Sequence, residues 1–151
     1  MVVLHLSTDH YTPEVPTIQI CAALILDTAG RMLLVRKRGT AAFLQPGGKP
    51  EAGETPVQTI ARELDEELGL RLQAERFETL GTFEDDAANE PGHRVQGHAF
   101  RVILTDAEAA SAAEAAEIEE ARWASVEDAV TLPLAPLTRR FFLPLVSSAT
   151  R

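Results

Sequence analysis

The sequence predicts one α/β (α+β) domain, a sandwich of helices on a mixed β-sheet. Three observations support this fold class: apolar strand-like segments recur along the chain, one sharply delimited amphipathic helix follows the second of them, and an apolar helical segment lies near the end. The chain of 151 residues has room for one hydrophobic core and shows neither an internal repeat nor a linker. We therefore expect a single domain over residues 1–151, with residues 1–16 as an N-terminal extension.

Five segments are predicted to form strands, because each is short, apolar and bounded by turn residues. They span residues 18–26, 32–35, 77–83, 95–104 and 120–124. The first two flank the turn Asp27-Thr28-Ala29-Gly30 and should form a hairpin. A Pro/Gly loop is expected over residues 43–48, and the polar stretch 84–93, which contains Pro91-Gly92, is a candidate substrate loop.

The helix predicted over residues 56–68 carries clear start and stop signals. Thr55 is a suitable N-cap, Pro56 suits the first helical position, and Gln58 completes a T-x-x-Q capping box. Gly69 stands where a left-handed C-cap is needed. Apolar residues at helical spacing define one buried face, which comprises Val57, Ile60, Ala61, Leu64 and Leu68.

The last third of the chain is less distinctive. Residues 106–117 are rich in Ala and Glu and carry little pattern. Residues 134–146 are predicted to form the last helix, and Pro144 should limit this helix near its end because proline lacks the N–H that a helix interior needs.

The composition is that of an ordinary globular chain, with 45% hydrophobic and 25% charged residues. A formal net charge of −9 argues against duplex nucleic acid as a partner, because phosphate backbones are bound mainly by clustered Lys and Arg. Cys21 is the only cysteine, which excludes an intrachain disulfide and favours a reducing compartment, so the expected location is cytoplasmic. No segment resembles a signal peptide or a membrane span, and no membrane partner is expected.

Three glutamates stand out within the predicted helix. Glu63, Glu66 and Glu67 are separated by three and four residues, so their side chains crowd together on one stripe of the helix surface. A divalent cation would relieve their mutual repulsion, and such hard oxygen ligands suit Mg²⁺ or Mn²⁺ better than Zn²⁺. The alternative interpretation is an acidic face that is only solvated.

The residues around this stripe match the Nudix box, in which Gly is followed after five residues by Glu and after seven more by Arg-Glu-apolar-x-Glu-Glu-x-Gly-apolar. The matching residues are Gly48, Glu54, Arg62, Glu63, Leu64, Glu66, Glu67, Gly69 and Leu70. Every prescribed position is filled, so residues 48–70 closely resemble the MutT-like Nudix hydrolases. The resemblance implies an α/β/α sandwich in which the box forms a loop, a helix and a second loop that hold the metal.

The resemblance also implies roles for the box residues. Glu63, Glu66 and Glu67 would bind Mg²⁺, with Mn²⁺ possible, and the carbonyl of Gly47 would be a further ligand. Glu63 or Glu66 would take the proton of the attacking water. Arg62 and Glu54 resemble the family's internal ion pair, which orients the box, although Arg62 alone is equally compatible with a helix-surface pair to Glu66.

Some family members use a further glutamate that precedes a late strand containing Trp. Glu117 stands six residues before Trp123 and is a candidate ligand or base. Glu114 competes with it, and a solvated charge is an equally good interpretation of each.

Candidate substrate-binding residues flank the box or lie on the later strands. Arg36, Arg38 and Lys49 would meet phosphates, and alternation along a strand puts Arg36 and Arg38, but not Lys37, on one side. Phe43, Gln45, Asn89, Arg94 and His98 would line a specificity pocket. Ordinary packing or surface exposure is the alternative for each of them.

The activity implied by the resemblance is cleavage of a pyrophosphate bond in a nucleoside diphosphate linked to another group. Signatures of several subfamilies are absent, since Asp85 and Asp86 replace a proline typical of ADP-ribose hydrolases, and Ala87 and Ala88 replace a tyrosine typical of dinucleoside polyphosphate hydrolases. A nucleoside triphosphate is therefore the expected substrate. The alternatives are a nucleotide-sensing module that binds without cleaving and a plain interaction module; a homodimer is a possible assembly.

Overall fold

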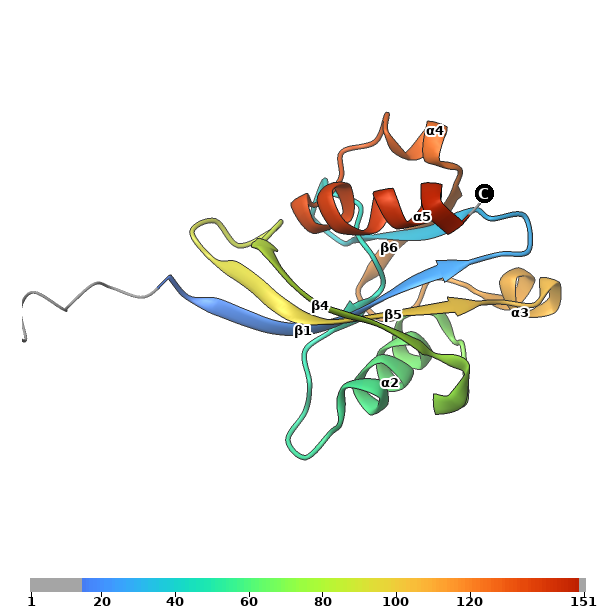
Figure 1. The fold of residues 1–151 in the computed structure, drawn as a ribbon, viewed down its shortest axis with the longest axis horizontal. Helices are drawn as coiled ribbons and strands as arrows, with labels where there is room; N and C mark the ends of the chain where they lie inside the picture. The colour runs from blue at the N-terminus through green and yellow to red at the C-terminus, as the bar shows by residue number, and fades with distance from the viewer. Residues whose placement is uncertain (1–14, 150–151) are drawn as a thin grey trace, which may run out of the picture.

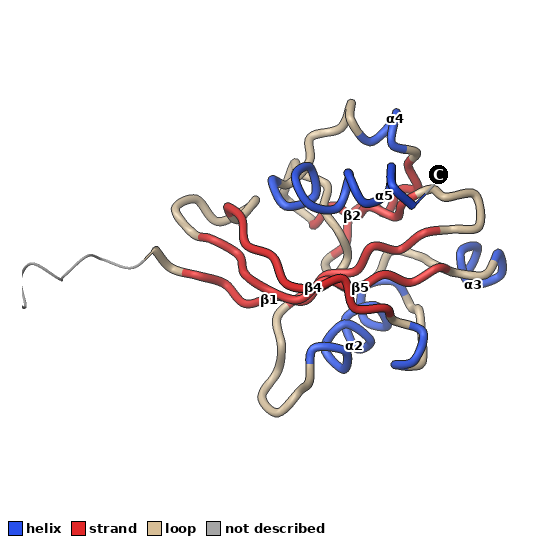
Figure 2. Tube along the Cα trace, in the orientation of Figure 1, coloured by secondary structure: helices blue, strands red, loops and turns tan. Residues whose placement is uncertain are grey.

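The computed structural model describes residues 15–149 and shows a mixed β-sheet between two layers of helices (Figures 1 and 2). The strands lie in the order β4-β5-β1-β2-β6, and β3 pairs with β1 beside this path. Their bounds are β1 Thr17–Leu26, β2 Met32–Lys37, β3 Gly47–Gly48, β4 Glu78–Asp86, β5 Arg94–Ile103 and β6 Ile118–Ala124. Strands β1 and β5 are parallel and the other paired strands are antiparallel, which confirms the predicted mixed sheet.

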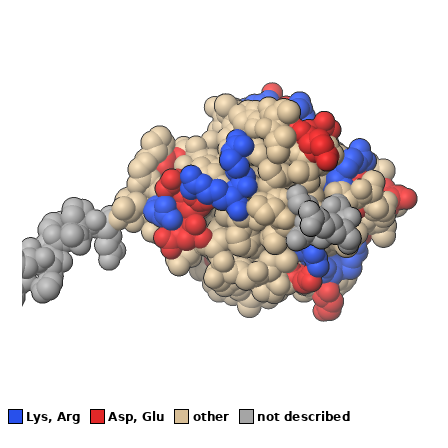
Figure 3. All heavy atoms as spheres, turned by 45° about the horizontal axis from the view of Figure 1, so that its top comes forward, with Lys and Arg blue, Asp and Glu red and all other residues tan. Residues whose placement is uncertain are grey.

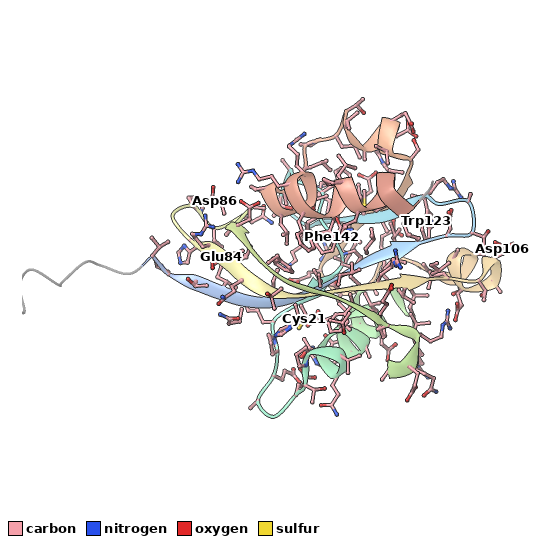
Figure 4. All side chains as sticks on the ribbon, in the orientation of Figure 1. Cys21, Glu84, Asp86, Asp106, Trp123 and Phe142 are labelled. Atoms are coloured by element: carbon pink, nitrogen blue, oxygen red, sulfur yellow. The ribbon has the colours of Figure 1, made fainter. Side chains whose placement is uncertain are left out.

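Strand β1 divides the interior into two cores, because successive side chains of a strand point to opposite faces. Leu24 packs on one face with Phe142 of the C-terminal layer. Ile25 packs on the other face with Leu64 of α2. Figure 4 shows Phe142 above the sheet and Cys21 of β1 on the side of α2.

Helix α2, Pro56–Leu68, has the bounds that the sequence predicts. The Thr55 hydroxyl accepts a hydrogen bond from the Gln58 N–H, and the Gln58 side chain accepts one from the Thr55 N–H at 2.9 Å. At the other end, Gly69 adopts a left-handed conformation with φ 69° and donates its N–H to the Asp65 carbonyl. Both ends are fixed locally, so the axial position of every glutamate on the helix is fixed as well.

Strands β1 and β2 diverge from the register pair Leu26–Met32, and residues 43–48 lie between them. Leu44 exchanges two backbone hydrogen bonds of 2.9 Å with Val35 of β2, and Ala23 of β1 donates to the Pro46 carbonyl at 3.0 Å. The expected Pro/Gly loop over residues 43–48 is therefore partly wrong. This segment completes the sheet between the two strands.

The C-terminal helix differs from the prediction at both ends. It comprises a π-helical turn η2, Thr138–Phe142, and helix α5, Leu143–Ala149. It does not begin at residue 134 because Ala135 donates its N–H to the Phe43 carbonyl at 2.9 Å. Pro144 does not limit it, because the chain is helical without a break from residue 136 to 149 and the wider π turn lies directly before the proline, whose ring would otherwise clash with the preceding turn.

Two further expectations need correction. The polar loop expected over residues 84–93 shrinks to 87–93, since Arg94 bonds across the strands to Glu84 at 3.3 Å and Asp86 at 2.8 Å and so extends the hairpin. Part of the unpatterned stretch forms helix α3, Asp106–Ser111. Short elements η1, Ala74–Arg76, and α4, Val126–Ala129, complete the described chain.

The expected N-terminal extension, residues 1–16, lies outside the described residues except for Val15 and Pro16. The Pro16 carbonyl accepts a hydrogen bond of 2.8 Å from the Arg94 N–H, which joins this residue to the start of β5. Within residues 15–149, no helix is both long and apolar enough to cross a membrane.

Acid should weaken the attachment of α3 to η1. Arg76 donates to both carboxylate oxygens of Glu108 at 2.8 Å, and this bond, helped by the Thr105 N–H, lowers the pKa of Glu108 to about 2. The folded pKa lies below the ordinary value of 4.5, so the stabilisation is fully present above that value and is lost as pH falls from 4.5 towards 2. We expect Glu108→Gln to flatten the dependence of unfolding free energy on pH in this window, as measured by urea unfolding. The exposed Glu75→Gln is the control, and an unaltered slope in Glu108→Gln would contradict the assignment.

Candidate active site

Arg62 of α2 and Glu54 of the preceding loop form an ion pair that joins the loop to the helix. Arg62 binds the Glu54 carboxylate with two nitrogens, at 2.6 and 3.0 Å, and also donates to the Lys49 carbonyl at 3.0 Å. Glu54 further accepts from the Glu51 N–H at 2.7 Å and the Thr59 hydroxyl at 3.0 Å. The bond to Arg62 lowers the pKa of Glu54 to about 2 and raises the pKa of Arg62. The ion pair is present as the sequence predicts, and it fixes the loop to the helix.

Arg62 also reaches two of the three glutamates. Its guanidinium donates to Glu63 at 2.8 Å and lies 3.3 Å from a carboxylate oxygen of Glu66. Both interpretations of Arg62, the pair with Glu54 and the helix-surface pair with Glu66, are therefore correct at once. The Glu66 side chain is 53% exposed, and Glu63 is 14% exposed, so the stripe runs from solvent into the protein.

Glu67 is the deepest of the three carboxylates, with 2% of the residue exposed. One of its oxygens accepts a hydrogen bond of 3.1 Å from the Gly47 N–H. Burial, and then the neighbouring charge of Glu63, raise the pKa of Glu67 to about 8. An isolated buried carboxylate is costly, so this position favours a group that carries compensating positive charge.

The carboxylate of Glu63 fills the space beside Gly48. A Cβ atom at Gly48 would lie 2.4 Å from the carboxylate carbon of Glu63, so a glycine is required for this close approach. Burial raises the pKa of Glu63. Strand β3 is thus the element that brings the backbone of Gly47 and Gly48 against the glutamates of α2.

Lys37 lies closer to this site than the sequence prediction placed it. Its ammonium is 3.5 Å from Glu117. Burial and the charge of Glu63 affect the pKa of Glu67 most, but the charge of Lys37 also lowers this pKa and the charge of Glu117 raises it. Alternation from Val35, which faces α2, gives Lys37 the same face. Glu114 instead accepts a hydrogen bond of 3.1 Å from the Ala121 N–H, so Glu117 is the glutamate of this segment beside the site.

Arg36 and Arg38, two of the three expected phosphate contacts, are directed elsewhere. Arg36 lies over the ring of the buried Phe43, 5.9 Å from its centroid, and Arg122 lies 5.2 Å from the same ring. Arg38 lies 3.4 Å from Glu119. The packing interpretation is therefore correct for Phe43, and among residues 36–38 it is Lys37 that faces the glutamates.

The remaining candidates are dispersed. Lys49, Asn89 and His98 are exposed, on the loop before α2, in the β4–β5 hairpin and on β5 respectively. Gln45 is 3% exposed and lies within the segment that fills the gap between β1 and β2. The structure thus gathers the box residues with Lys37 and Glu117, whereas Asn89 lies away from them in the β4–β5 hairpin.

The model of the NUDIX domain family matches residues 16–145, from the start of β1 into α5. The chain belongs to this family. The box identified by resemblance is the Nudix box, and the layered sheet with α2 on one face is the Nudix fold.

Two relatives illustrate the range of Nudix proteins. An 8-oxo-dGTP diphosphatase from Haemophilus influenzae is 42% identical over 66 residues, which cover 40% of this chain and 48% of that protein. An RNA pyrophosphohydrolase from Rhodospirillum rubrum is 27% identical over 135 residues, which cover 82% of this chain and 81% of that protein. The match to the first relative thus spans about half of its length.

Among solved structures, the MutT protein from Methanosarcina mazei Go1 has a TM-score of 0.70 and 22% sequence identity, covering 93% of this chain and 99% of that one. This similarity concerns the fold. It places the arrangement of β1, β3 and α2 described above within the Nudix architecture.

The box residues fit the divalent cation on which Nudix hydrolases generally depend. The donors are carboxylate and carbonyl oxygens, the ligand type that Mg²⁺ and Mn²⁺ prefer. In the arrangement described for residues 15–149, no three acidic, His or Cys side chains converge as a finished metal site, because Arg62 draws Glu63 and Glu66 towards itself. The exposed Glu66 is free of packing constraints and can turn from Arg62 to a cation.

Proposed function

We propose that this protein is a divalent-metal pyrophosphohydrolase acting on a nucleoside diphosphate linked to another group, with a nucleoside triphosphate as substrate. One observation supports the proposal above the others. The complete set Glu63, Glu66 and Glu67 lies on one helix against the backbone of Gly47, and the Arg62–Glu54 pair holds that helix to its loop.

Each residue has a role in this proposal. Glu63, Glu66, Glu67 and the Gly47 carbonyl would hold Mg²⁺ or Mn²⁺, which when bound polarises phosphoryl oxygens and acidifies coordinated water. Glu63 or Glu66 accepts the proton of the attacking water. Arg62 is a positioning residue, since it determines where these carboxylates point.

Lys37 and Glu117 add a charged pair at the edge of the same site. The Lys37 ammonium offers a fixed positive charge to a phosphate oxygen, and Glu117 becomes available as a further ligand or base when that contact forms. Because phosphoryl transfer depends on positioned charge, a cation at this place favours departure of an anionic leaving group.

The identity of the substrate draws support from the relatives. Both are named for cleavage within a phosphoanhydride chain, one of a nucleoside triphosphate and one of RNA. A complete carboxylate set favours catalysis over a sensing module that binds without cleaving.

The proposal also covers the binding partners of the protein and its cellular compartment. On the face that carries the C-terminal helix, Lys and Arg side chains lie beside Asp and Glu side chains and form no continuous basic patch (Figure 3). We propose nucleotides, and not duplex nucleic acid, as partners, and the cytoplasm as the compartment. A possible homodimer is tested by light scattering on the purified chain.

The position of bond cleavage provides the test. We expect a nucleoside triphosphate to give a nucleoside monophosphate and pyrophosphate, because a divalent cation held by Glu63, Glu66 and Glu67 would stabilise the negative charge of a pyrophosphate leaving group. Hydrolysis in ¹⁸O-labelled water, with products resolved by mass, measures this directly, and an enzyme-free sample provides the background. Orthophosphate as the first product of several triphosphates, without pyrophosphate, would show that the chemistry is of another kind.

A further inference from the structure

The buried polar side chains of this protein differ in how their hydrogen bonds are satisfied. Among the described residues, Gln45 and Thr138 have buried polar atoms without a hydrogen-bond partner. Thr59 of α2 is fully buried, but its hydroxyl lies 3.0 Å from a carboxylate oxygen of Glu54 and 3.2 Å from the Thr55 carbonyl. A hydroxyl carries one proton, so the two acceptors compete for it. A helical threonine commonly bonds only the carbonyl one turn earlier, so the contact with Glu54 calls for an explanation.

The carboxylate of Glu54 has all of its acceptor positions filled. One oxygen accepts from the Glu51 N–H at 2.7 Å, from Thr59 at 3.0 Å and from an Arg62 nitrogen at 3.0 Å. The other oxygen accepts from Nε of Arg62 at 2.6 Å. Two carboxylate oxygens offer about four lone-pair sites, so these four bonds hold the group in one place. Thr59 is thus the anchor that ties Glu54 to α2 independently of Arg62.

The guanidinium of Arg62 is bonded in two directions. Nε and one terminal nitrogen bind Glu54 and the Lys49 carbonyl. The other terminal nitrogen binds Glu63 at 2.8 Å and Glu66 at 3.3 Å, and these bonds must be released before the two glutamates can hold a cation. Arg62 would follow the departing carboxylates unless its first set of bonds held it back. The position of Glu54 therefore decides whether Arg62 competes with a cation for the glutamates.

The other side of Thr59 faces strand β1. Burial raises the pKa of the Cys21 thiol and the neighbouring Thr59 hydroxyl lowers it, which places the two side chains together between β1 and α2. Figure 4 shows Cys21 on the α2 side of the sheet. The backbone of Cys21 pairs with Gly48 of β3, so one residue of β1 adjoins both the helix and the strand of the box. Thr59 is thus enclosed between β1 and Glu54, and its hydroxyl has no access to water.

We propose that Thr59 is a positioning residue of the metal site, an inference that rests on the proposed function. Its hydroxyl holds the Glu54 carboxylate, and Glu54 in turn keeps Arg62 in place while the metal-binding glutamates turn to a cation. Without the hydroxyl, Glu54 loses a bond that is strong because the acceptor is charged. Arg62 then stays with Glu63 and Glu66 and competes with the cation. Residues that act behind metal ligands in this way commonly change metal affinity by about 10- to 100-fold.

Substitution of Thr59 by valine and by serine separates the hydroxyl from the packing. Thr59→Val keeps the size of the side chain and removes the hydroxyl, whereas Thr59→Ser keeps the hydroxyl and removes a buried methyl group. We expect calorimetric titration with Mg²⁺ to give an affinity about 10-fold weaker for Thr59→Val and close to wild type for Thr59→Ser. Wild-type affinity in Thr59→Val, or equal losses in the two variants, would overturn the proposal.

Melting temperatures exclude a general loss of stability as the cause. Both variants should melt below the wild type, because one loses a hydrogen bond to a charged group and the other a buried methyl group. Thr138→Val is the matched control, since Thr138 is 1% exposed and its hydroxyl has no partner among the described residues. Its Mg²⁺ affinity should equal that of the wild type. An equal loss of affinity in Thr138→Val would show that Thr59 has no special role.

The position of Arg62 can be measured without any metal. Its Nε–H donates to Glu54 at 2.6 Å, so this proton should exchange slowly with water in the wild-type protein. We expect this exchange, followed by nuclear magnetic resonance in the metal-free protein, to be about 10-fold faster in Thr59→Val and to return to the wild-type rate in Thr59→Ser. Unchanged exchange in Thr59→Val would mean that Glu54 holds Arg62 without help from Thr59, against the proposal.

The metal-free measurement also separates this inference from the proposed function. If the wild-type protein binds no Mg²⁺ and hydrolyses no nucleotide, the hydrolase proposal fails, whereas faster Arg62 exchange in Thr59→Val and its return in Thr59→Ser would still support the role of Thr59 in placing Arg62. If the wild type and Thr59→Val bind Mg²⁺ equally well and both hydrolyse nucleotides, the hydrolase proposal stands and the positioning proposal fails.

Discussion

Glu67→Gln should lower turnover by about 100-fold or more while leaving the fold intact, as expected for loss of a metal ligand. The substitution replaces a carboxylate oxygen with an amide nitrogen that cannot bind a cation, but the remaining oxygen can still accept the bond from the Gly47 N–H. Because burial raises the pKa of Glu67 to about 8, the neutral glutamine resembles the form that the metal-free protein holds at neutral pH. The exposed Glu66→Gln should cause a loss of the same order, since its carboxylate serves the same cation.

Steady-state kinetics together with calorimetric titration of Mg²⁺ measure this effect. A raised folded pKa means that the charged form of Glu67 costs stability above the unfolded pKa of 4.5, so Glu67→Gln should be no less stable than the wild type at pH 7. Glu75→Gln, on the exposed surface of η1, should retain full turnover. Losses below about tenfold in both Glu66→Gln and Glu67→Gln would contradict the ligand assignment.

Removal of divalent cations should abolish turnover completely. The stripe of Glu63, Glu66 and Glu67 contains no Ser or Cys nucleophile, and the thiol of Cys21 is fully buried, so we expect the attacking group to be a water molecule that a metal activates. Without a cation the carboxylates would repel an anionic substrate instead of binding it. We expect activity to vanish in excess EDTA and to return when Mg²⁺ or Mn²⁺ is added beyond the chelator.

Circular dichroism recorded on the same samples excludes unfolding as the cause. Arg62 and Lys37 already provide positive charge among the glutamates of the metal-free protein, so chelation should leave the spectrum unchanged. Undiminished turnover in excess EDTA would show that the chemistry does not use a metal.

Helix α2 could be predicted to the residue because its signals are local. Thr55, Gln58 and Gly69 act within one turn of the helix ends, and the sequence displays them directly. The C-terminal helix lacked such signals. Its expected start at residue 134 failed because Ala135 bonds to Phe43, 92 positions earlier in the chain, which no local pattern reveals.

The residues of the site also differ in how well the sequence predicts them. The glutamates and their link to Arg62 follow from spacing on one helix and from the Nudix box, whereas alternation along β2 was applied to the wrong face, so Arg36 and Arg38 were preferred to Lys37. Alternation counted from the buried Val35 puts Lys37 on the face of α2 and Arg36 on the opposite face. The unpaired state of Gln45 depends on packing around it and had no signal in the sequence.

The gap between β1 and β2 has a consequence for the order in which the protein folds. The caps let α2 form early, but the glutamates meet Gly47 only after residues 44–46 have bridged the two strands. The full-length parallel pairing of β1 with β5 closes a loop of more than 60 residues and is slow by nature, because its chain entropy is lost before its contacts form. During refolding we therefore expect helix content to return ahead of metal affinity, because the proposed cation would need chains whose central sheet is complete.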